Sequence, residues 1–317
     1  MGVRGSGADL AAVAVFGGKG CALIAKAALC AVLLLLFGAF WMRPGLYGST
    51  NALTGKRWAW SYANPLKWPD HFAHCGGVEQ SPVDLVHMKS VNASQVPLLS
   101  LAGYDKSLSS LSLLNNGRTA VLSFAKRGIS IKSDLAFRVG RTLVPGPVKY
   151  TLEQLHFHWG DGGKDGMGSE HSVDGKHYPG EMHLVHYNSK YASLDEAAAK
   201  SDGLLAIGVF LDKAQSGQDL LASAELEKLS FVKLGEGESR ELSRSFSVHD
   251  LLSPIDAEKY FSYAGSLTTP RCFESVTWIV FGDPLAISPS FLSNLQMMGG
   301  ANYRPTMRLG SRKVLSP

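Results

Sequence analysis

Two short segments in which histidine alternates with apolar side chains place the strongest constraint on the fold of this 317-residue chain. Residues 154–159 have the sequence QLHFHW, and residues 181–186 have the sequence EMHLVH. In a β-strand, side chains two positions apart lie on the same face of the sheet. His156 and His158 therefore share one face. If the two segments are neighbouring strands, His183 joins them and three imidazoles converge on one point.

Three converging imidazoles predict a metal site of a particular kind. Three neutral histidine nitrogens leave a fourth tetrahedral position open, which is typical of a catalytic zinc site and not of a closed structural one. Gln154 and Glu181 each precede a histidine by two residues and share its face. Metal-bound imidazoles usually donate their other N–H to such groups. A single His-x-His pair is more often structural, but these additions favour zinc held by His156, His158 and His183.

The other periodic segments of the chain are also short and predict a mainly β fold. Strand-like segments of about four to eight residues occur at 121–124, 152–159, 182–187, 204–211 and 276–281. Turn signals such as Asn116-Gly117 separate them. Residues 194–200 and 219–229 have a helical pattern. We therefore expect one domain built on a large, mostly antiparallel sheet with small peripheral helices.

The N-terminal region differs in composition from the rest of the chain. Residues 27–42 carry no charge and follow a second apolar run that ends at Lys26. A signal peptide has an apolar core of about 7–15 residues and a membrane-spanning helix needs about 20, so this run falls between the two. We expect residues 1–42 to be a cleaved signal peptide or a membrane-associated signal-anchor, with a bipartite organelle presequence as a further alternative. Residues 43–57 are predicted to be a linker, and residues 58–317 the folded domain.

The charge distribution argues against a nucleic-acid partner. The net charge is only +4, and the basic residues are scattered without an arginine-rich run. A basic cluster near the C-terminus comprises Arg304, Arg308, Arg312 and Lys313. We expect this cluster to be a solvated tail.

Several motifs occur together in a fixed order. They are QLHFHWG at 154–160, GSEHSVDG at 168–175, EMHLVHYN at 181–188 and YAGSLTTP at 263–270, with QSPVDL, LLNNG, VTWIVF and NYRP as shorter matches. In these motifs the chain from about Trp58 to Arg308 resembles the α-class carbonic anhydrases. The resemblance implies a twisted sheet of about ten strands with one zinc ion, held by His156, His158 and His183, at the base of a cone.

The resemblance also implies an activity, the reversible hydration of carbon dioxide to bicarbonate and a proton by zinc-bound hydroxide. Zinc lowers the pKa of bound water to about 7, and carbonic anhydrase is the standard example of this effect. Carbon dioxide, bicarbonate and water are then the reactants. Sulfonamides and simple anions are expected as inhibitors. A binding module on the same fold and an enzyme acting mainly on esters are the alternatives, but the former typically lacks a zinc ligand and nothing in the sequence indicates an ester pocket.

Further site residues follow from the same resemblance. Thr268 is expected to accept a hydrogen bond from the hydroxide and to donate its own proton to Glu170, because an ionised carboxylate can only accept. Asn302 is predicted to support the zinc ligands together with Gln154 and Glu181. The implied substrate pocket comprises Val185, Ala206, Leu267, Thr269 and Trp278. Without the resemblance, its apolar members are equally well explained as core residues.

One position departs from the family pattern. Fast members carry a histidine after the NNG motif, and this histidine transfers protons because its pKa lies near neutrality. Here the position is Arg118, and an arginine side chain stays protonated near neutral pH. Proton transfer is therefore expected to limit turnover. Tyr62 and Asn116 match residues that order water in the cavity, and His71 and His74 are alternative proton carriers.

Two cysteines indicate the compartment. Cys75 and Cys272 match a pair that forms a disulfide in the secreted and membrane-bound branches of the family. A disulfide requires an oxidising environment, so an extracytosolic protein, secreted or anchored by its N-terminal segment, is expected. Asn92-Ala93-Ser94 is an N-glycosylation sequon, which agrees with a secretory route.

Overall fold

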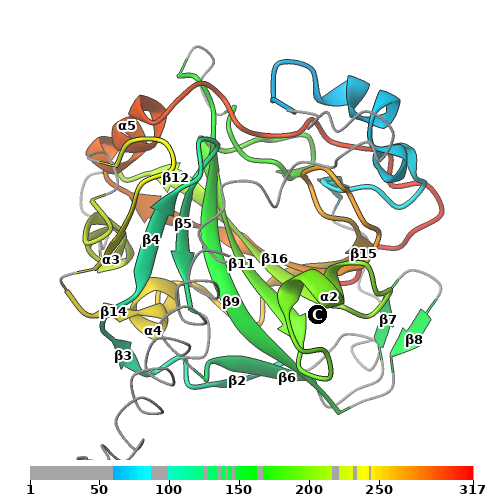
Figure 1. The fold of residues 1–317 in the computed structure, drawn as a ribbon, viewed down its shortest axis with the longest axis horizontal. Helices are drawn as coiled ribbons and strands as arrows, with labels where there is room; N and C mark the ends of the chain where they lie inside the picture. Colours follow the sequence, from blue (N-terminus) through cyan, green and yellow to red (C-terminus); the bar gives the residue numbers. More distant parts are fainter. Residues whose placement is uncertain are drawn as a thin grey trace, which may run out of the picture. The chain divides into compact units, whose positions relative to one another are not determined.

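Figure 1 presents the computed structural model of the chain. It describes residues 60–86, 99–124, 128–133, 137–139, 142–144, 147–162, 167–215, 221–230, 234–242 and 244–316. The predicted N-terminal segment, the linker and the sequon at Asn92 lie outside these residues. Within them, no helix has both the length and the apolar character needed to cross a bilayer.

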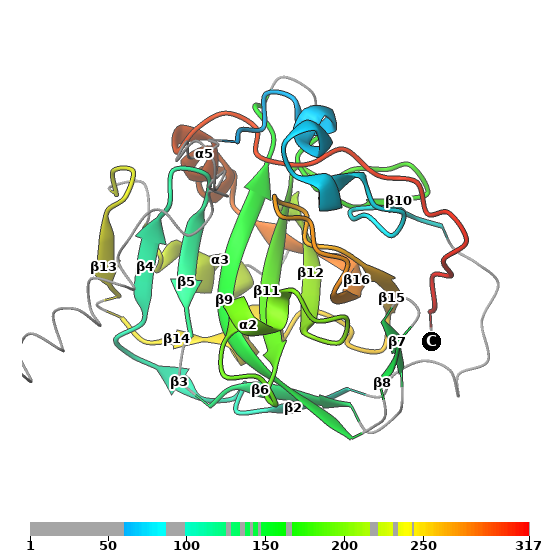
Figure 2. The same cartoon turned by 45° about the vertical axis from the view of Figure 1, so that its right-hand side comes forward.

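A ten-stranded sheet organises the described residues (Figures 1 and 2). Eight strands follow in the order β13-β4-β5-β9-β11-β12-β16-β15, and β6 pairs with both β9 and β2. The strands are β2 (Leu99–Ala102), β4 (Ser112–Asn115), β5 (Ala120–Ser123), β6 (Ser130–Ser133), β9 (Val148–Trp159), β11 (Gly180–Asn188), β12 (Leu204–Lys213), β13 (Ser239–Glu241), β15 (Tyr260–Gly265) and β16 (Val276–Ile287). The pairs are antiparallel except β12 with β16, which is parallel. The predicted mainly β, mostly antiparallel domain is confirmed.

Smaller elements surround this sheet. Two-stranded sheets join β1 (Asp84–Leu85) with β10 (Ser172–Val173), β3 (Ser107–Leu108) with β14 (Phe246–Ser247), and β7 (Phe137–Val139) with β8 (Thr142–Val144). The helices are η1 (Pro65–Asp70), η2 (Ala73–Gly76), α2 (Leu194–Ala198), α3 (Leu221–Glu227), α4 (Val248–Leu252) and α5 (Pro289–Met297). The two predicted helical segments correspond to α2 and α3, and the five predicted strands to β5, β9, β11, β12 and β16.

Local sequence signals fix where three of these helices begin. Ser193, Ser247 and Ser288 stand immediately before α2, α4 and α5, and each side-chain hydroxyl accepts a hydrogen bond from a backbone N–H of the first turn. A serine at this position satisfies an N–H that has no partner within the helix, which stabilises a helix by about 1 kcal/mol. Helix α5 also has a proline in its first turn, where the fixed φ of that residue favours the helical conformation.

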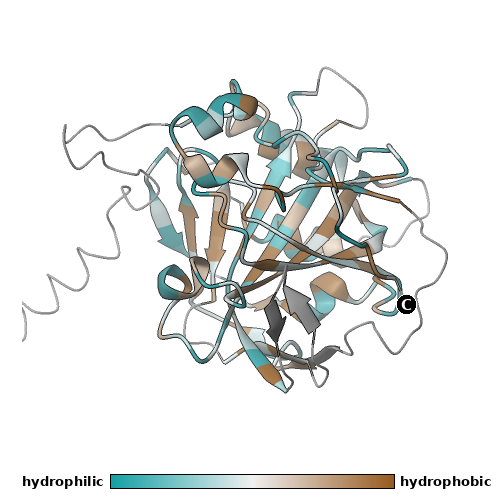
Figure 3. Cartoon of the chain, turned by 90° about the vertical axis from the view of Figure 1, so that its right-hand side faces the viewer, coloured by the Kyte–Doolittle hydropathy of each residue, from teal (hydrophilic) through white to brown (hydrophobic). Residues whose placement is uncertain are grey.

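The alternation of side chains along the strands separates the core from the histidines. Leu155, Phe157 and Leu184 point to one face of the sheet and join a large buried cluster that includes residues of α3, α4 and α5. Figure 3 shows hydrophobic residues concentrated along the strands, with hydrophilic ones interspersed. His156 and His183 occupy the intervening positions and point to the other face. Helices α3, α4 and α5 thus pack on one face, and the site forms on the opposite one.

The basic C-terminal cluster is not a solvated tail, so that expectation was wrong. In Figures 1 and 2 the C-terminal segment runs beside the N-terminal segment of the described domain. Arg304 is only 1% exposed, and its guanidinium donates to Gln80 Oε1, to the Ser81 carbonyl and to the Cys75 carbonyl. A buried guanidinium requires such acceptors, because removing a charge from water is costly.

Arg312 strengthens the same contact between the two ends of the domain. Its guanidinium donates to the carbonyls of Ala264 and Gln80. Only Arg308 and Lys313 of the cluster are exposed as expected. Periodicity in the sequence does not reveal these bonds, because the acceptors lie far away along the chain.

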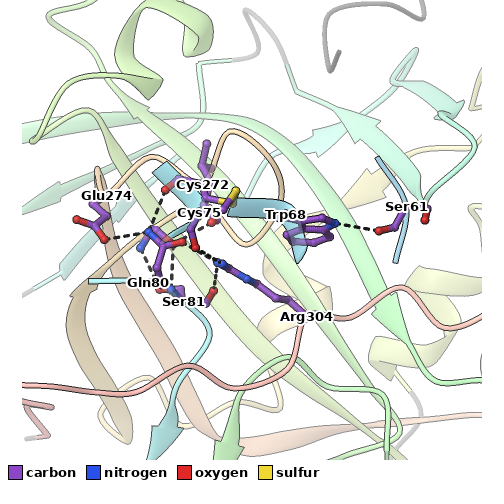
Figure 4. Close-up of a disulfide and its surroundings, with 10 residues drawn as sticks. Ser61, Trp68, Cys75, Gln80, Ser81, Cys272, Glu274 and Arg304 are labelled. Atoms are coloured by element: carbon purple, nitrogen blue, oxygen red, sulfur yellow. Dashed lines mark hydrogen bonds between the residues drawn. A yellow bond between two sulfur atoms is a disulfide. The ribbon is translucent and has the colours of Figure 1, made fainter. Parts of the chain in front are cut away.

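The predicted disulfide between Cys75 and Cys272 is present (Figure 4). It joins η2 to the loop that follows β15, across 197 positions of sequence. The Cys272 N–H donates to the Thr269 carbonyl at 2.8 Å, and the Cys272 carbonyl accepts from Gln80 Nε2 at 3.2 Å. The cross-link therefore braces the loop that carries Thr268 and Thr269.

Replacing both cysteines tests the contribution of this cross-link to stability. We expect the Cys75→Ser/Cys272→Ser double variant to lose about 2–5 kcal/mol of unfolding free energy, because the long loop is no longer constrained in the unfolded chain. Urea denaturation of the double variant and the parent under non-reducing conditions measures the difference. Equal unfolding free energies would contradict the expectation.

Candidate metal centre

The register of β9 and β11 brings three histidines together. His156 and His183 are directly opposite each other in the antiparallel pair, and His158 is opposite Glu181. The ring nitrogens of His156, His158 and His183 that face one another lie within 4.8 Å. His156 Nε2 and His158 Nε2 are 3.1 Å apart.

A different acceptor holds the outer nitrogen of each ring. The acceptors are Gln154 Oε1 for His156 Nδ1 at 3.0 Å, the Asn302 carbonyl for His158 Nδ1 at 2.8 Å, and Glu181 Oε1 for His183 Nε2 at 2.8 Å. Carbonyl and carboxylate oxygens only accept hydrogen bonds, so these three nitrogens carry the protons. The lone pairs of His156 Nε2, His158 Nε2 and His183 Nδ1 are consequently left to face one another.

This donor set fits a zinc ion. Burial is the main cause that lowers the pKa of His158 to about 3, and it also lowers the pKa values of His156 and His183. All three rings are therefore neutral at pH 7 and available as ligands. Tetrahedral zinc with Zn–N distances of 2.0–2.1 Å places its ligand nitrogens about 3.3 Å apart, close to the observed 3.1 Å. Without a cation between them, the three nitrogen lone pairs would repel one another.

Glu181 is the most heavily bonded residue around the histidines. Its Oε1 accepts from His183 Nε2 and from His171 Nδ1, and its Oε2 accepts from the backbone N–H groups of Glu170 and His171. Burial alone would raise the pKa of Glu181. Electrostatic interaction and hydrogen bonding with His171 and His183 outweigh this effect and hold the pKa well below its usual range. Glu181 is thus an ionised, fully buried acceptor.

The hydrogen bonds continue away from Glu181 through residues that the sequence did not single out. His171 Nε2 lies 2.7 Å from the Tyr263 hydroxyl, which donates to Ser81 Oγ at 2.8 Å. All three residues stand within motifs of the family pattern, which was the only signal that could have found them. Through His171 they help to hold Glu181 Oε1, the same oxygen that accepts from His183.

Asn302 supports His158 through both its backbone and its side chain. Its carbonyl accepts from His158 Nδ1, and its Oδ1 accepts from the Trp159 N–H at 2.6 Å. Its Nδ2 donates to the carbonyls of Arg118 and Phe157. One residue from the C-terminal segment therefore holds the end of β9 in place beside the ligand.

Glu170 lies next to the three histidines and is fully buried. Its Oε1 accepts from the Arg304 N–H at 2.9 Å and lies 3.5 Å from His158 Nδ1. Burial raises the pKa of Glu170 well above its usual range, and interaction with the Thr268 hydroxyl opposes the increase. Among the described residues, no group donates to Oε2 with standard hydrogen-bond geometry. We therefore expect Oε2 to be the acceptor for the Thr268 hydroxyl.

Comparison with known proteins agrees with this geometry. Residues 63–317 match the family model described as eukaryotic-type carbonic anhydrase. The chain belongs to this family. It is 33% identical to carbonic anhydrase 6 of Homo sapiens over 269 residues, which cover 81% of this chain and 82% of that protein.

Further relatives have similar coverage. The chain is 33% identical to carbonic anhydrase 6 of Bos taurus over 289 residues, covering 89% of this chain and 82% of that protein. It is 37% identical to carbonic anhydrase 7 of Mus musculus over 237 residues, covering 72% of this chain and 81% of that protein. The chain is therefore a carbonic anhydrase in sequence, and its fold and histidine cluster are consistent with that assignment.

Apolar residues form a row beside the histidines of this carbonic anhydrase. Val185 pairs with Ala206 across β11 and β12, and Ala206 pairs with Trp278 across β12 and β16. All three are buried, and the centre of the Trp278 ring lies 4.8 Å from the centre of the His183 ring. Leu267 is partly buried and packs against the same cluster. Four of the five predicted pocket residues, all except Thr269, thus lie together on the face that carries the three histidines.

The side chain of Arg118 is held against Trp60. Its Nη2 donates to the Trp60 carbonyl at 3.1 Å, and its guanidinium lies 4.2 Å from the centre of the Trp60 ring. Tyr62 packs edge-on against the same ring. Burial and the charge of Glu170 raise the pKa of Tyr62, and the charge of Arg118 opposes the increase. Tyr62 therefore experiences the fields of both the buried carboxylate and the guanidinium.

The remaining candidates for proton transfer have other contacts. Asn116 Oδ1 accepts from the backbone N–H groups of Arg118 and Thr119, so this oxygen holds the turn between β4 and β5. His71 and His74 are exposed, and the His74 ring packs edge-on against Phe273. No contact with the three metal-site histidines is observed for either of them within the described residues.

Gly208 offers a test of how strongly Glu181 controls metal binding. A Cβ atom at position 208 would lie 2.9 Å from Glu181 Oε1, so Gly208→Ala must displace the carboxylate from His183. We expect zinc affinity to fall by roughly tenfold, as for other losses of a group that orients a ligand. Competition with a chromophoric zinc chelator measures the affinity.

Gly282→Ala is the matched control for this substitution. Gly282 lies on β16, the strand that neighbours the β12 strand of Gly208, but a Cβ at position 282 would meet nothing closer than 3.6 Å. We expect it to bind zinc like the parent. Parent-like affinity in Gly208→Ala would show that Glu181 does not set the strength of the site.

Proposed function

We propose that this carbonic anhydrase holds one zinc ion at His156, His158 and His183 and hydrates carbon dioxide reversibly there. The observation that carries the proposal is the convergence of three unprotonated ring nitrogens, each fixed by an acceptor on the far side of its ring. A bound zinc ion lowers the pKa of a coordinated water to about 7, as is established for carbonic anhydrases in general, and thereby supplies a nucleophile at neutral pH.

Thr268 and Glu170 orient the reacting water. A zinc ion at the three histidines would oppose the effect of burial on the pKa of Glu170 and so favour the ionised carboxylate. An ionised carboxylate can only accept a hydrogen bond, so the Thr268 hydroxyl must donate to it. The Thr268 oxygen then accepts from the water and fixes the direction of its remaining lone pair. The Arg304 N–H keeps Glu170 in place by donating to the other carboxylate oxygen. The direction of every bond in this relay follows from the carboxylate at its end.

The apolar row is the proposed site for carbon dioxide. Val185, Ala206, Leu267 and Trp278 offer no strong donor or acceptor toward the ligands, which suits a small neutral molecule. The Trp278 indole N–H is already bonded to the Ser266 carbonyl. Thr269 is proposed to line the side toward bicarbonate. Relatives in this family usually carry a larger aliphatic residue at the position of Ala206, so the pocket is proposed to be slightly wider here. Sulfonamides and simple anions are proposed to bind at the zinc position as inhibitors.

The compartment is proposed to be outside the cytosol. The disulfide supports this because cytosolic proteins rarely maintain such a bond. Residues 1–42 would serve as the signal peptide or signal-anchor, residues 43–57 as a linker and residues 58–317 as the catalytic domain. Asn92 would then be open to glycosylation.

Stopped-flow measurement of carbon dioxide hydration tests the proposal. We expect activity that a chelator removes and added zinc restores. Thr268→Ala should lower kcat/KM by roughly 10²-fold, because the oriented acceptor in the relay is lost, whereas Thr268→Ser, which keeps the hydroxyl, should retain most of it. An inactive, folded and zinc-loaded parent would overturn the proposal.

The arginine at position 118 leads to a separate expectation about the rate of proton transfer to the solvent. Arginine cannot release a proton near neutral pH, so proton transfer to the solvent should limit turnover. Arg118→His should raise kcat by roughly tenfold in weak buffer, because an imidazole can carry the proton. The kcat of the parent should rise with the concentration of imidazole buffer until it equals the kcat of Arg118→His. Equal turnover in weak buffer would contradict the expectation.

A further inference from the structure

The two carboxylate oxygens of Glu170 have different surroundings. Oε1 accepts a hydrogen bond from the Arg304 N–H at 2.9 Å, whereas Oε2 has no donor with standard geometry among the described residues. The backbone of Glu170 is held separately, because its N–H donates to Glu181 Oε2 at 2.9 Å. The orientation of the carboxylate therefore depends on the position of the Arg304 N–H, which leaves Oε2 for the Thr268 hydroxyl.

The Arg304 N–H lies in a short segment that connects two parts of the domain. At one end of this segment, the Asn302 N–H donates to the Trp159 carbonyl of β9 at 3.1 Å. At the other end, the Met307 N–H donates to the Pro82 carbonyl at 2.7 Å. Between these two attachments, Arg304 is the buried residue. Its side chain is therefore what fixes the middle of the segment.

The guanidinium of Arg304 is held by uncharged acceptors. Its Nη1 donates to Gln80 Oε1 at 2.9 Å and to the Ser81 carbonyl at 2.8 Å, and its Nη2 donates to the Cys75 carbonyl at 3.0 Å (Figure 4). Burying a charge is costly, and apolar residues of similar volume often stabilise a protein as well as a buried charged group does. What a guanidinium adds is a planar fork that bonds in defined directions. Its contribution here is the direction in which the segment is held.

The acceptors of the guanidinium also contact the loop of Thr268. Gln80 Nε2 donates to the Cys272 carbonyl at 3.2 Å. Cys75, whose carbonyl accepts from Arg304, forms the disulfide with Cys272, which lies four residues after Thr268. One set of contacts therefore supports both the loop of Thr268 and the residue that orients its partner carboxylate.

We propose that Arg304 is a positioning residue of the relay, because its guanidinium fixes the N–H that selects which oxygen of Glu170 receives the Thr268 hydroxyl. The inference rests on the proposed function and deepens it, since it assigns a role in the reaction to a side chain buried beside the disulfide. Asn302, which supports His158, has its own side-chain bonds to β9. A change at Arg304 should therefore disturb the relay and leave the metal ligands in place.

Substitution of Arg304 in the full chain tests this role. Stopped-flow hydration rates are divided by the concentration of bound zinc, so that only folded and loaded protein is counted. Arg304→Gln should lower kcat/KM per bound zinc by about tenfold, because a small misplacement in an active site costs up to about 10²-fold in rate. Arg304→Lys keeps the charge without the planar fork and should lose about threefold; it decides the question if Arg304→Gln does not fold. Zinc affinity, measured by chelator competition, should stay within about twofold of the parent in both variants.

A double-mutant cycle with Glu170→Gln separates positioning from a general loss of stability. The ionised acceptor is absent in the Glu170→Gln background, so neither substitution of Arg304 should lower kcat/KM per bound zinc any further. A further loss as large as the loss in the parent background would overturn the inference, because Arg304 would then act independently of Glu170.

Arg312→Gln is the matched control. Arg312 also donates to backbone carbonyls, including that of Gln80, but no contact with Glu170 is observed for it within the described part of the chain. It should keep kcat/KM per bound zinc within about twofold of the parent, and a loss equal to that of Arg304→Gln would overturn the inference.

Two further results would overturn this inference alone. The first is an unchanged kcat/KM per bound zinc in the variants of Arg304 when the parent is active. The second is a fall in zinc affinity as large as the fall in kcat/KM, because the side chain would then support the whole metal centre and not the relay. A parent that holds zinc but does not hydrate carbon dioxide would overturn the proposed function and this inference with it.

Discussion

The site depends on the buried carboxylate of Glu181. An ionised carboxylate inside a protein costs several kcal/mol unless its oxygens are fully bonded, and here each oxygen accepts two hydrogen bonds. Those donors come from β11 itself and from the segment around Glu170 and His171. Satisfying one carboxylate therefore fixes the ring of His183, a proposed zinc ligand, and the backbone of Glu170 together. Gly208 has no Cβ atom, and this leaves room for the Glu181 carboxylate beside it.

The sheet could be predicted from the sequence because its period is visible along a single strand. Alternating residues assign His156 and His158 to one face, and the apolar residues between them to the core. The same period places Gln154 beside His156 and Glu181 beside His183. What a single strand cannot reveal is which strands are neighbours. The parallel pairing of β12 with β16, which aligns Ala206 with Trp278, was accordingly not predicted in detail.

The parts of the site that the sequence did not reveal are held by contacts between distant segments. The chain from His171 through Tyr263 to Ser81 joins three motifs that no periodicity connects. Arg304 belongs to a cluster of basic residues near the C-terminus, which favoured the prediction of a solvated tail, although it is buried against Gln80 and the carbonyl of Cys75 in the disulfide (Figure 4). Burial of a charged residue depends on acceptors elsewhere in the chain, so local composition cannot predict it.

The most direct test of the account is the coordination of the metal itself. X-ray absorption at the zinc edge measures the ligand types and their distances in the metal-loaded protein. The three fixed imidazoles predict one zinc ion with four nitrogen or oxygen ligands at about 2.0–2.1 Å, three of them histidine. Sulfur ligands at about 2.3 Å, or an ion surrounded mainly by oxygen, would contradict the account.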